Sequence, residues 1–185
     1  MSGGDAPDAR RTPEREIVRA ASDHLVGLGY RTFPDPDGTD YFDLVARRGS
    51  EVGLLEAKVA GPRRVLVQAL RRRVWGDWVA VVLASRRSAE RLAERTGAAR
   101  SAPVGVWAVD RGVVTVVRPA RPWGEPRSPD PYAGLKERFR SLLDDLEQGV
   151  RPTGVRWDDV AREIHRASGG RRFAEWRLDE GRLEP

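Results

Sequence analysis

The sequence contains no cysteine, one methionine and only two histidines, His24 and His165. The absence of cysteine excludes disulfide bonds, thiolate nucleophiles and cysteine-ligated zinc. The two histidines lie far apart in the chain, so the sequence indicates neither a histidine-rich zinc site nor a histidine-containing catalytic triad. A phosphate-binding glycine loop followed by its lysine is also missing, and no small-molecule cofactor is expected.

Long hydrophobic runs are absent as well. The longest apolar run, over 78–84, is far too short to cross a bilayer. The first residues carry charges but no apolar segment behind them, so no secretory signal is expected. With 39% hydrophobic and 33% charged residues, the composition predicts a soluble protein in the cytoplasm.

Lysine is nearly absent, since only Lys58 and Lys136 stand among the 33 Lys and Arg residues. The net charge is +5, and the basic excess is uneven: residues 1–122 hold 21 Lys and Arg against 15 Asp and Glu, whereas 123–185 hold 12 against 13. A basic excess favours a polyanionic partner such as DNA. The alternative is a general preference for arginine with no nucleic acid involved.

Hydrophobic periodicity predicts alternating helices and strands. The predicted helices are 12–28, 65–75, 88–97, 132–147 and 157–167. The predicted strands are 30–33, 41–46, 52–59, 77–84, 104–110 and 113–119. This order is typical of an α/β fold with a mixed central sheet covered by helices.

The chain divides into four parts by composition. Residues 1–11 are polar and are predicted to be disordered. The α/β core is predicted to span 12–120, and the Pro- and Gly-rich stretch 121–131 follows as a linker. Residues 132–185 form a helical C-terminal extension that could cap the sheet, mediate formation of a homodimer, or contact DNA.

Three ionisable residues stand in two of the apolar strands. Glu56 and Lys58 are two residues apart in the strand 52–59, so they project to the same side of the sheet. Asp43 lies in the preceding strand, which a short hairpin joins to this one. Carboxylates from neighbouring strands can bind one hard cation, and Mg²⁺ needs only one or two of them. The pattern predicts a Mg²⁺ site, with Mn²⁺ expected to substitute.

Lys58 is the unusual member of this group because the chain chooses arginine almost everywhere else. A lysine ammonium is a compact charge that can lose its proton when desolvated, whereas arginine stays protonated. Lys58 could therefore position or deprotonate a water nucleophile, or stabilise charge that develops on phosphorus. The alternative is a plain Glu–Lys ion pair on a partly buried face.

Glu14 is a further candidate. At helical spacing it falls on the apolar stripe of the first helix and is expected to face the sheet, whereas Glu16 points the other way. The alternative is a glutamate that the helix dipole favours in a first turn.

Four short segments in this order resemble the PD-(D/E)XK nuclease superfamily, especially restriction-endonuclease-like proteins and archaeal Holliday-junction resolvases. They are PEREIV, YFDLVA, LLEAKV and VLVQAL, and the resemblance covers about 12–118. Phe42 stands where the name of the motif has proline. The resemblance implies a restriction-endonuclease-like core.

The resemblance also implies roles for individual residues. The catalytic residues would be Asp43, Glu56, Lys58, Glu14 and Gln68, and the metal ligands would be Asp43, Glu56 and the backbone carbonyl of Ala57. Glu14 would be an outer or second-metal acid, and Gln68 would face the active site from the second helix. For Gln68 the alternative is an ordinary solvated helix position.

Arginines near these segments are candidates for holding DNA phosphates. They are Arg47, Arg48, Arg63, Arg64, Arg71 and Arg72. Phosphate contacts of this kind give affinity without sequence choice. The alternative is a solvated helix face.

Three functions remain open at this point. The first is a metal-dependent nuclease that hydrolyses phosphodiester bonds in DNA, in repair, recombination or defence. The second is a non-catalytic nucleic-acid-binding module on the same fold. The third is a small adaptor that acts through its C-terminal helices.

Overall fold

The computed structural model describes residues 13–35, 42–97, 104–122 and 133–150, together with 178–179 and 182–183. The predicted disordered segment 1–11, most of the predicted linker 121–131, the predicted helix 157–167 and His165 lie outside these residues. Among the helices described, none is long and apolar enough to cross a membrane.

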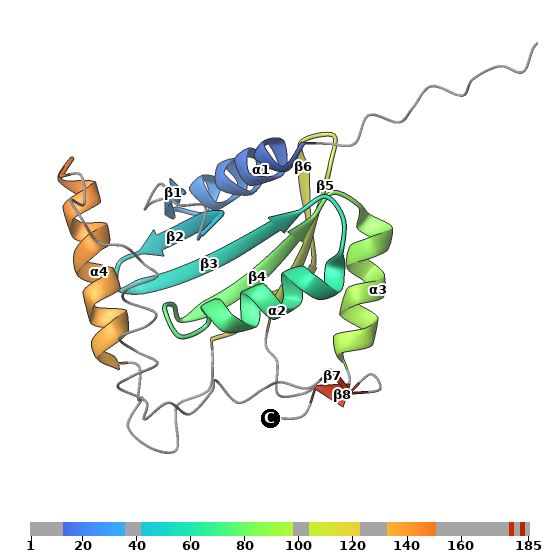
Figure 1. Ribbon diagram of the computed structural model, residues 1–185. Coiled ribbons are helices and arrows are strands. Elements are labelled where there is room, and N and C mark those ends of the chain that lie inside the picture. Colours follow the sequence, from blue (N-terminus) through green and yellow to red (C-terminus); the bar gives the residue numbers. More distant parts are fainter. Residues whose placement is uncertain are drawn as a thin grey trace, which may run out of the picture.

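The described residues form helices and strands in alternation along the chain (Figure 1). The helices are α1 (Glu14–Gly27), α2 (Pro62–Arg72), α3 (Arg86–Gly97) and α4 (Ala133–Glu147). The strands are β1 (Arg31–Pro34), β2 (Leu44–Arg48), β3 (Glu51–Lys58), β4 (Trp78–Leu83), β5 (Gly105–Asp110), β6 (Val113–Arg118), β7 (Leu178–Asp179) and β8 (Arg182–Leu183).

Strands β1 to β6 form one six-stranded sheet in their chain order. The pairs β3–β4 and β4–β5 are parallel, while β1–β2, β2–β3 and β5–β6 are antiparallel. Helix α2 makes the crossover from β3 to β4 and helix α3 the crossover from β4 to β5, as parallel neighbours require. The predicted α/β class with a mixed sheet flanked by helices is confirmed.

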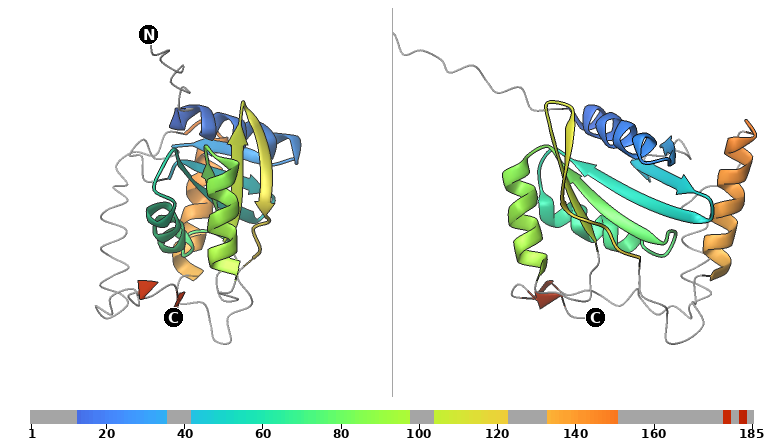
Figure 2. Two further views of the ribbon diagram at one scale, coloured as in Figure 1. Left: turned by 90° about the vertical axis from the view of Figure 1, so that its right-hand side faces the viewer. Right: turned by 180° about the vertical axis from the view of Figure 1, so that it is seen from behind.

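Helices cover both faces of the sheet (Figure 2). On one face, Leu54 of β3 and Val81 of β4 belong to a hydrophobic cluster that includes residues of α2, α3 and α4. On the other face, Leu55 of β3 and Ala80 of β4 belong to a second cluster, which includes residues of α1. Period-two alternation along the strands therefore divides the core into two layers.

Two predicted boundaries near the candidate site are wrong by a few residues. Helix α1 begins at Glu14 rather than at residue 12, because Pro13 has an extended ψ of 148° and is the N-cap. Helix α2 spans Pro62–Arg72 rather than 65–75. Gly61 before it has a φ of 80°, a conformation that glycine adopts without strain, and Pro62 suits the first turn of a helix because the missing N–H has no intrahelical partner there.

Helix α4, the described helix of the C-terminal extension, packs onto the core. Its residues Leu135, Phe139, Leu142 and Leu143 belong to the cluster on the α2 face. The Phe139 ring lies 5.0 Å from that of Phe42 and 5.8 Å from that of Trp75. Of the three roles open for the extension, α4 performs the first: it caps the sheet, and its apolar side is not free to bind a partner.

Candidate functional site

A hydrogen bond links Asp43 to Ala57 at the end of the β2–β3 ladder. The last paired residues are Leu44 and Leu55, so Asp43 directly precedes β2, and the prediction that it lies inside the strand is wrong by one residue. In place of a further backbone pair, the Ala57 N–H donates to Asp43 Oδ2 at 2.7 Å. The side chain thus ends the ladder and holds its carboxylate beside β3.

Lys58, the last residue of β3, joins this carboxylate to α1. Its Nζ donates to Glu14 Oε1 at 2.7 Å and lies 4.0 Å from Asp43 Oδ2. The three residues come from β3, from the first turn of α1 and from the position before β2. The structure therefore brings Glu14, Asp43 and Lys58 together, as the sequence predicts.

Glu56 is buried on the α2 face of β3, with 2% of its surface exposed. Its Oε1 accepts a hydrogen bond of 2.6 Å from Arg72 Nε, and the guanidinium of Arg72 also lies 5.4 Å from the ring centre of Phe42. Arg72 is itself buried, at 9% exposure. The prediction that Arg72 lies on the surface and holds a DNA phosphate is wrong, because its side chain points inward to Glu56.

The sequence contained a signal for the Arg72 contact. Residues four apart on a helix share a face, so Arg72 lies on the same side of α2 as Gln68, which was expected to face the site. The Gln68 Oε1 atom is buried and has no hydrogen-bond partner among the described residues. Gln68 is therefore not an ordinary solvated position, and its amide is left with capacity to bind a water or a ligand.

Burial raises the pKa of both carboxyls on the two neighbouring strands. The pKa of Glu56 rises to about 7 because burial and the charge of Asp43 outweigh the opposing effect of Arg72. The pKa of Asp43 is also raised, chiefly by burial, against the hydrogen bond from Ala57 and the charge of Lys58. The charge of Asp43 disfavours the ionised form of Glu56, and the charge of Glu14 disfavours that of Asp43; a bound cation would relieve this repulsion.

The pKa of Lys58 is raised above its usual value. Burial acts to lower it, but the hydrogen bond to Glu14 and the charges of Asp43, Glu14 and Glu56 outweigh that effect. Of the two roles that the sequence left open, this favours a permanently charged ammonium over a proton acceptor.

The residues present fit a hard divalent cation in number and chemistry. Three acidic side chains (Glu14, Asp43, Glu56) lie against two basic ones (Lys58, Arg72), so the acids outnumber the bases by one. No group of three or more His, Cys, Asp or Glu side chains suited to a metal occurs in the described part of the chain. Mg²⁺ does not require three, since one or two carboxylates with water and substrate phosphate complete its shell. Asp43 and Glu56, with the carbonyl of Ala57, would hold it.

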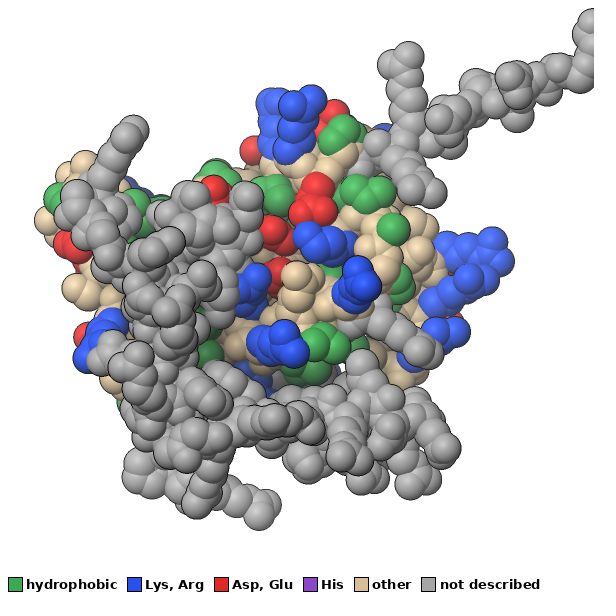
Figure 3. Space-filling view, viewed as in Figure 1, with side chains coloured by type: hydrophobic (Ala, Val, Ile, Leu, Met, Phe, Trp, Pro, Cys, Tyr) green, Lys and Arg blue, Asp and Glu red, His purple; other side chains and the backbone are tan. Residues whose placement is uncertain are grey.

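The surface around the site carries both signs of charge. On the face seen in Figure 3, acidic side chains gather near the centre, and Lys and Arg side chains lie beside and below them. Arg64 and Arg71 are exposed on α2, while the side chain of Arg63 lies outside the description. Phosphate binding remains a prediction for these three arginines.

Arg47 and Arg48 do not lie near this site. The β2–β3 hairpin is at the other end of β3, where Arg48 pairs with Glu51. The Arg47 guanidinium lies 2.6 Å from Asp144 of α4 and is largely buried. The sequence prediction missed this because the partner of Arg47 comes from a helix distant in the chain.

Comparison with known proteins adds little to these observations. No family model matches the chain, and no curated protein matches it. A similar solved structure is the SPO1766 protein of unknown function from Silicibacter pomeroyi, with 16% sequence identity, a TM-score of 0.49, and coverage of 89% of this chain and 98% of that chain. A similarity of this degree says nothing about function, and the resemblance to the PD-(D/E)XK superfamily stays a prediction.

Proposed function

We propose that the chain is a Mg²⁺-dependent nuclease that hydrolyses phosphodiester bonds in DNA, and that Mn²⁺ can replace Mg²⁺. The observation that carries the proposal is the position of Lys58. Its ammonium lies between Glu14 Oε1, at 2.7 Å, and Asp43 Oδ2, at 4.0 Å. The same strand presents Glu56 two residues earlier, so a lysine and two candidate metal ligands meet at one end of the sheet.

Each residue has a chemical role in this proposal. Asp43 and Glu56 would hold the metal, which would polarise the phosphodiester and lower the pKa of a water molecule. Lys58 keeps its proton, orients that water or stabilises the charge that develops on phosphorus. Glu14 holds the Lys58 ammonium in place at 2.7 Å. The buried oxygen of the Gln68 amide, which has no partner among the described residues, could accept a hydrogen bond from a water molecule at the site.

The basic excess of residues 1–122 supports a polyanionic substrate. The exposed Arg64 and Arg71 lie on α2, the helix that also presents Arg72 to Glu56. Contacts from these arginines to phosphates would position a strand across the metal ligands without reading its sequence.

The test is cleavage of labelled linear, single-stranded, flapped and four-way-junction DNA by the full chain, with Mg²⁺, with Mn²⁺ and with EDTA. We expect cutting that needs the metal and that falls by about 100-fold or more in Lys58→Ala, the usual range for removal of a catalytic side chain. Lys136→Ala is the matched control, because Lys136 is the other lysine of the chain and lies in α4.

Equal cutting by Lys58→Ala and wild type would refute the role of Lys58, and equal cutting by Asp43→Ala would refute the site. The control for the second variant is Asp110→Ala, which removes an exposed carboxylate at the end of β5.

One observation favours a second candidate, a nucleic-acid-binding module without catalysis. The Arg72 guanidinium already neutralises Glu56, with Nε 2.6 Å from Oε1. A carboxylate paired in this way can serve structure alone. Tight binding of DNA with no cutting of any substrate, in either metal, would support this candidate over the nuclease.

A further inference from the structure

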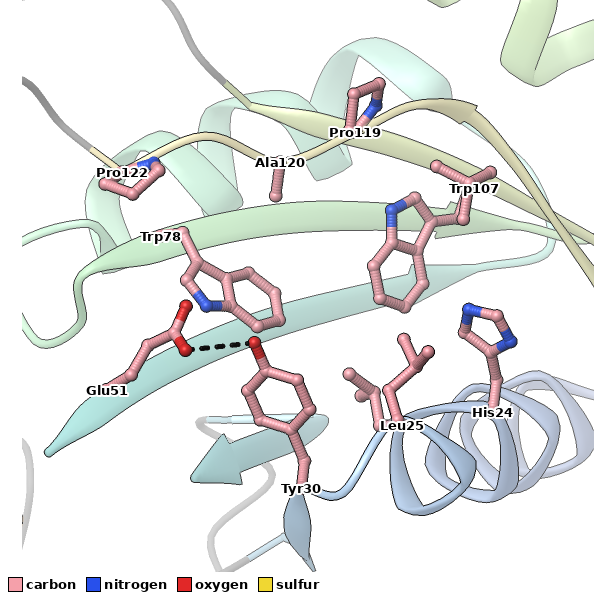
Figure 4. A pocket seen from close by; sticks show the side chains of 11 residues that line it. His24, Leu25, Tyr30, Glu51, Trp78, Trp107, Pro119, Ala120 and Pro122 are labelled. Carbon is pink, nitrogen blue, oxygen red and sulfur yellow. Dashed lines mark hydrogen bonds between the residues drawn. The ribbon is translucent and has the colours of Figure 1, made fainter. Parts of the chain in front are cut away.

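A separate pocket lies on the α1 face of the sheet, the face opposite to Glu56 and Arg72. Its volume is about 220 Å³, and it is lined by the C-terminal end of α1, the first residues of β3 and β4, parts of β5 and β6, and the segment 119–122 (Figure 4). Glu51 lines it from β3. Because Glu51 begins β3 and Lys58 ends it, the pocket and the candidate metal site lie at opposite ends of one strand.

Aromatic side chains make up much of the wall. The Trp78 and Trp107 rings lie 6.2 Å apart with an interplanar angle of 34°, and the Tyr30 ring meets Trp78 edge-on at 5.9 Å. The His24 ring stands edge-on to Trp107 at 5.6 Å. Trp78 lies so close over Gly53 that any side chain at that position would collide with the indole. The missing side chain at Gly53 thus leaves space for the indole ring of Trp78, which packs closely against the backbone.

Trp107 brings a hydrogen-bond donor that the fold does not use. The residue is 5% exposed, yet its indole Nε1 has no acceptor among the described residues. Figure 4 shows this nitrogen on the side of the ring that faces Ala120. A buried N–H without an acceptor is costly, so a ligand that supplies a carbonyl oxygen or ring nitrogen would gain affinity there.

The rim of the pocket is largely apolar and has two arginines beside it, of which Arg48 is paired with the lining residue Glu51 at 3.2 Å. Leu28 and Val116, which line it, are 52% and 42% exposed, far more than core side chains. The Arg48 guanidinium lies 4.4 Å above the Tyr30 ring, and the exposed Arg121 stands between the lining residues Ala120 and Pro122. Stacking surfaces flanked by arginines are the usual means of binding unstacked bases of single strands.

We propose that this pocket binds a nucleobase. A volume of about 220 Å³ is below that of pockets for drug-sized ligands and suits one flat ring system. The base contacts the indole rings of Trp78 and Trp107, accepts a hydrogen bond from Trp107 Nε1, and places its phosphates near Arg48 and Arg121. The same chemistry is offered by a base within a single strand and by a free nucleoside.

The proposal adds to the proposed function a second contact with the nucleic acid, on the face away from the metal site. It does not depend on cleavage, because binding is measured in EDTA with the full-length protein. A failure of the pocket and a failure of the nuclease are therefore separate results.

The test compares two fluorescent oligonucleotides of equal length and charge, one oligothymidylate and one built of abasic spacers. Anisotropy titrations should show that wild type binds the base-bearing strand about tenfold more tightly than the abasic strand. Val116→Asp should bring that ratio close to one. Val113→Asp should leave it unchanged, because Val113 lies on the same strand, is 66% exposed and does not line the pocket. Both variants add one negative charge, so general repulsion of DNA affects them equally and cannot account for a difference between them.

Trp107→Phe tests the indole N–H, and we expect it to lower the ratio while Trp75→Phe, a buried tryptophan of the other face, does not. Urea unfolding of each variant establishes that it is folded.

Competition by free thymidine would show that the base alone is sufficient for binding. If the ratio is intact but thymidine does not compete, the pocket binds bases only within a strand. Equal binding of the two oligonucleotides by wild type would overturn the proposal. An equal loss of the binding ratio in Val116→Asp and Val113→Asp would also overturn it. So would a pocket that binds a proline-rich peptide, seen as quenching of tryptophan fluorescence, and shows no preference for bases.

Discussion

The two ends of β3 carry sites of opposite chemistry. At its C-terminal end, Glu56 and Lys58 meet charged partners, and burial raises the pKa of both Glu56 and Asp43. At its N-terminal end, Glu51 accepts a hydrogen bond from Tyr30 beside two neighbouring tryptophan rings. Because Glu51 and Glu56 are an odd number of residues apart, the strand sends them to opposite faces.

The difference between the two ends decides what each can respond to. The charged end is sensitive to protons near neutral pH, because burial raises the pKa of Glu56 to about 7. The aromatic end depends on contact area and on the Tyr30 hydroxyl, which keeps its proton near neutral pH because burial raises its pKa. One strand thus has a charged site at one end and an aromatic site at the other.

The largest expected effect comes from breaking the buried ion pair at the charged end. In Arg72→Met, the Glu56 side chain stays buried, with 3% of its surface exposed, but loses the guanidinium that pairs with it. We expect the free energy of unfolding at pH 8, in EDTA, to fall by about 3–5 kcal/mol, as measured by urea denaturation. The double variant Arg72→Met/Glu56→Gln should recover most of the loss. A double variant no more stable than Arg72→Met would contradict the view that the uncompensated Glu56 charge is the cause.

A smaller effect is expected on the pH dependence of stability without metal. The pKa of Glu56 is 4.5 for the free side chain and about 7 in the folded protein, so the folded state holds more protons than the unfolded state between these values. Stability should therefore fall as pH rises from about 4.5 to about 7, by up to about 3 kcal/mol for this group. Asp43, whose pKa is also raised, acts in the same direction.

Urea unfolding of wild type and Glu56→Gln between pH 4.5 and pH 8 measures this effect. Glutamine keeps an oxygen that can accept the hydrogen bond from Arg72 but does not titrate. The decline in stability should be clearly shallower in the variant, and parallel curves for the two proteins would show that Glu56 titrates normally.

The smallest effect is expected at the aromatic end. Tyr30→Phe removes the 3.1 Å hydrogen bond to Glu51, which keeps its contact with Arg48 at 3.2 Å. The cost should be about 0.5–1.5 kcal/mol and should be the same at pH 5 and pH 8. A cost that changes strongly between these pH values would remove the contrast between the two ends.

Much of the charged site follows from the sequence because its geometry is local. Strand alternation places Glu56 and Lys58 on one side, and the short hairpin brings Asp43 to their neighbourhood. Helical spacing places Glu14 on the inner edge of α1, where its carboxylate reaches Lys58. These positions can be predicted from the periodicity of helices and strands and from the length of one turn.

The remaining features depend on contacts between distant parts of the chain. Arg47 was expected to hold phosphate, but Asp144 of α4 binds it. The tryptophans of the pocket come from β4 and β5, and neither strand alone indicates that they would be neighbours. Burial also decides the case of Arg72, because the run of arginines by itself does not indicate which member turns inward and only the spacing of four residues from Gln68 does.

The short link between β3 and α2 has a consequence for how this chain can vary in evolution. Lys58 ends β3, and after the left-handed Gly61 the helix begins at Pro62. One inserted residue would rotate α2 by about 100° relative to the strand and carry Arg72 and Gln68 away from Glu56. Relatives that keep the site should therefore keep the length of this link and its glycine, even where their other connections have grown or shrunk.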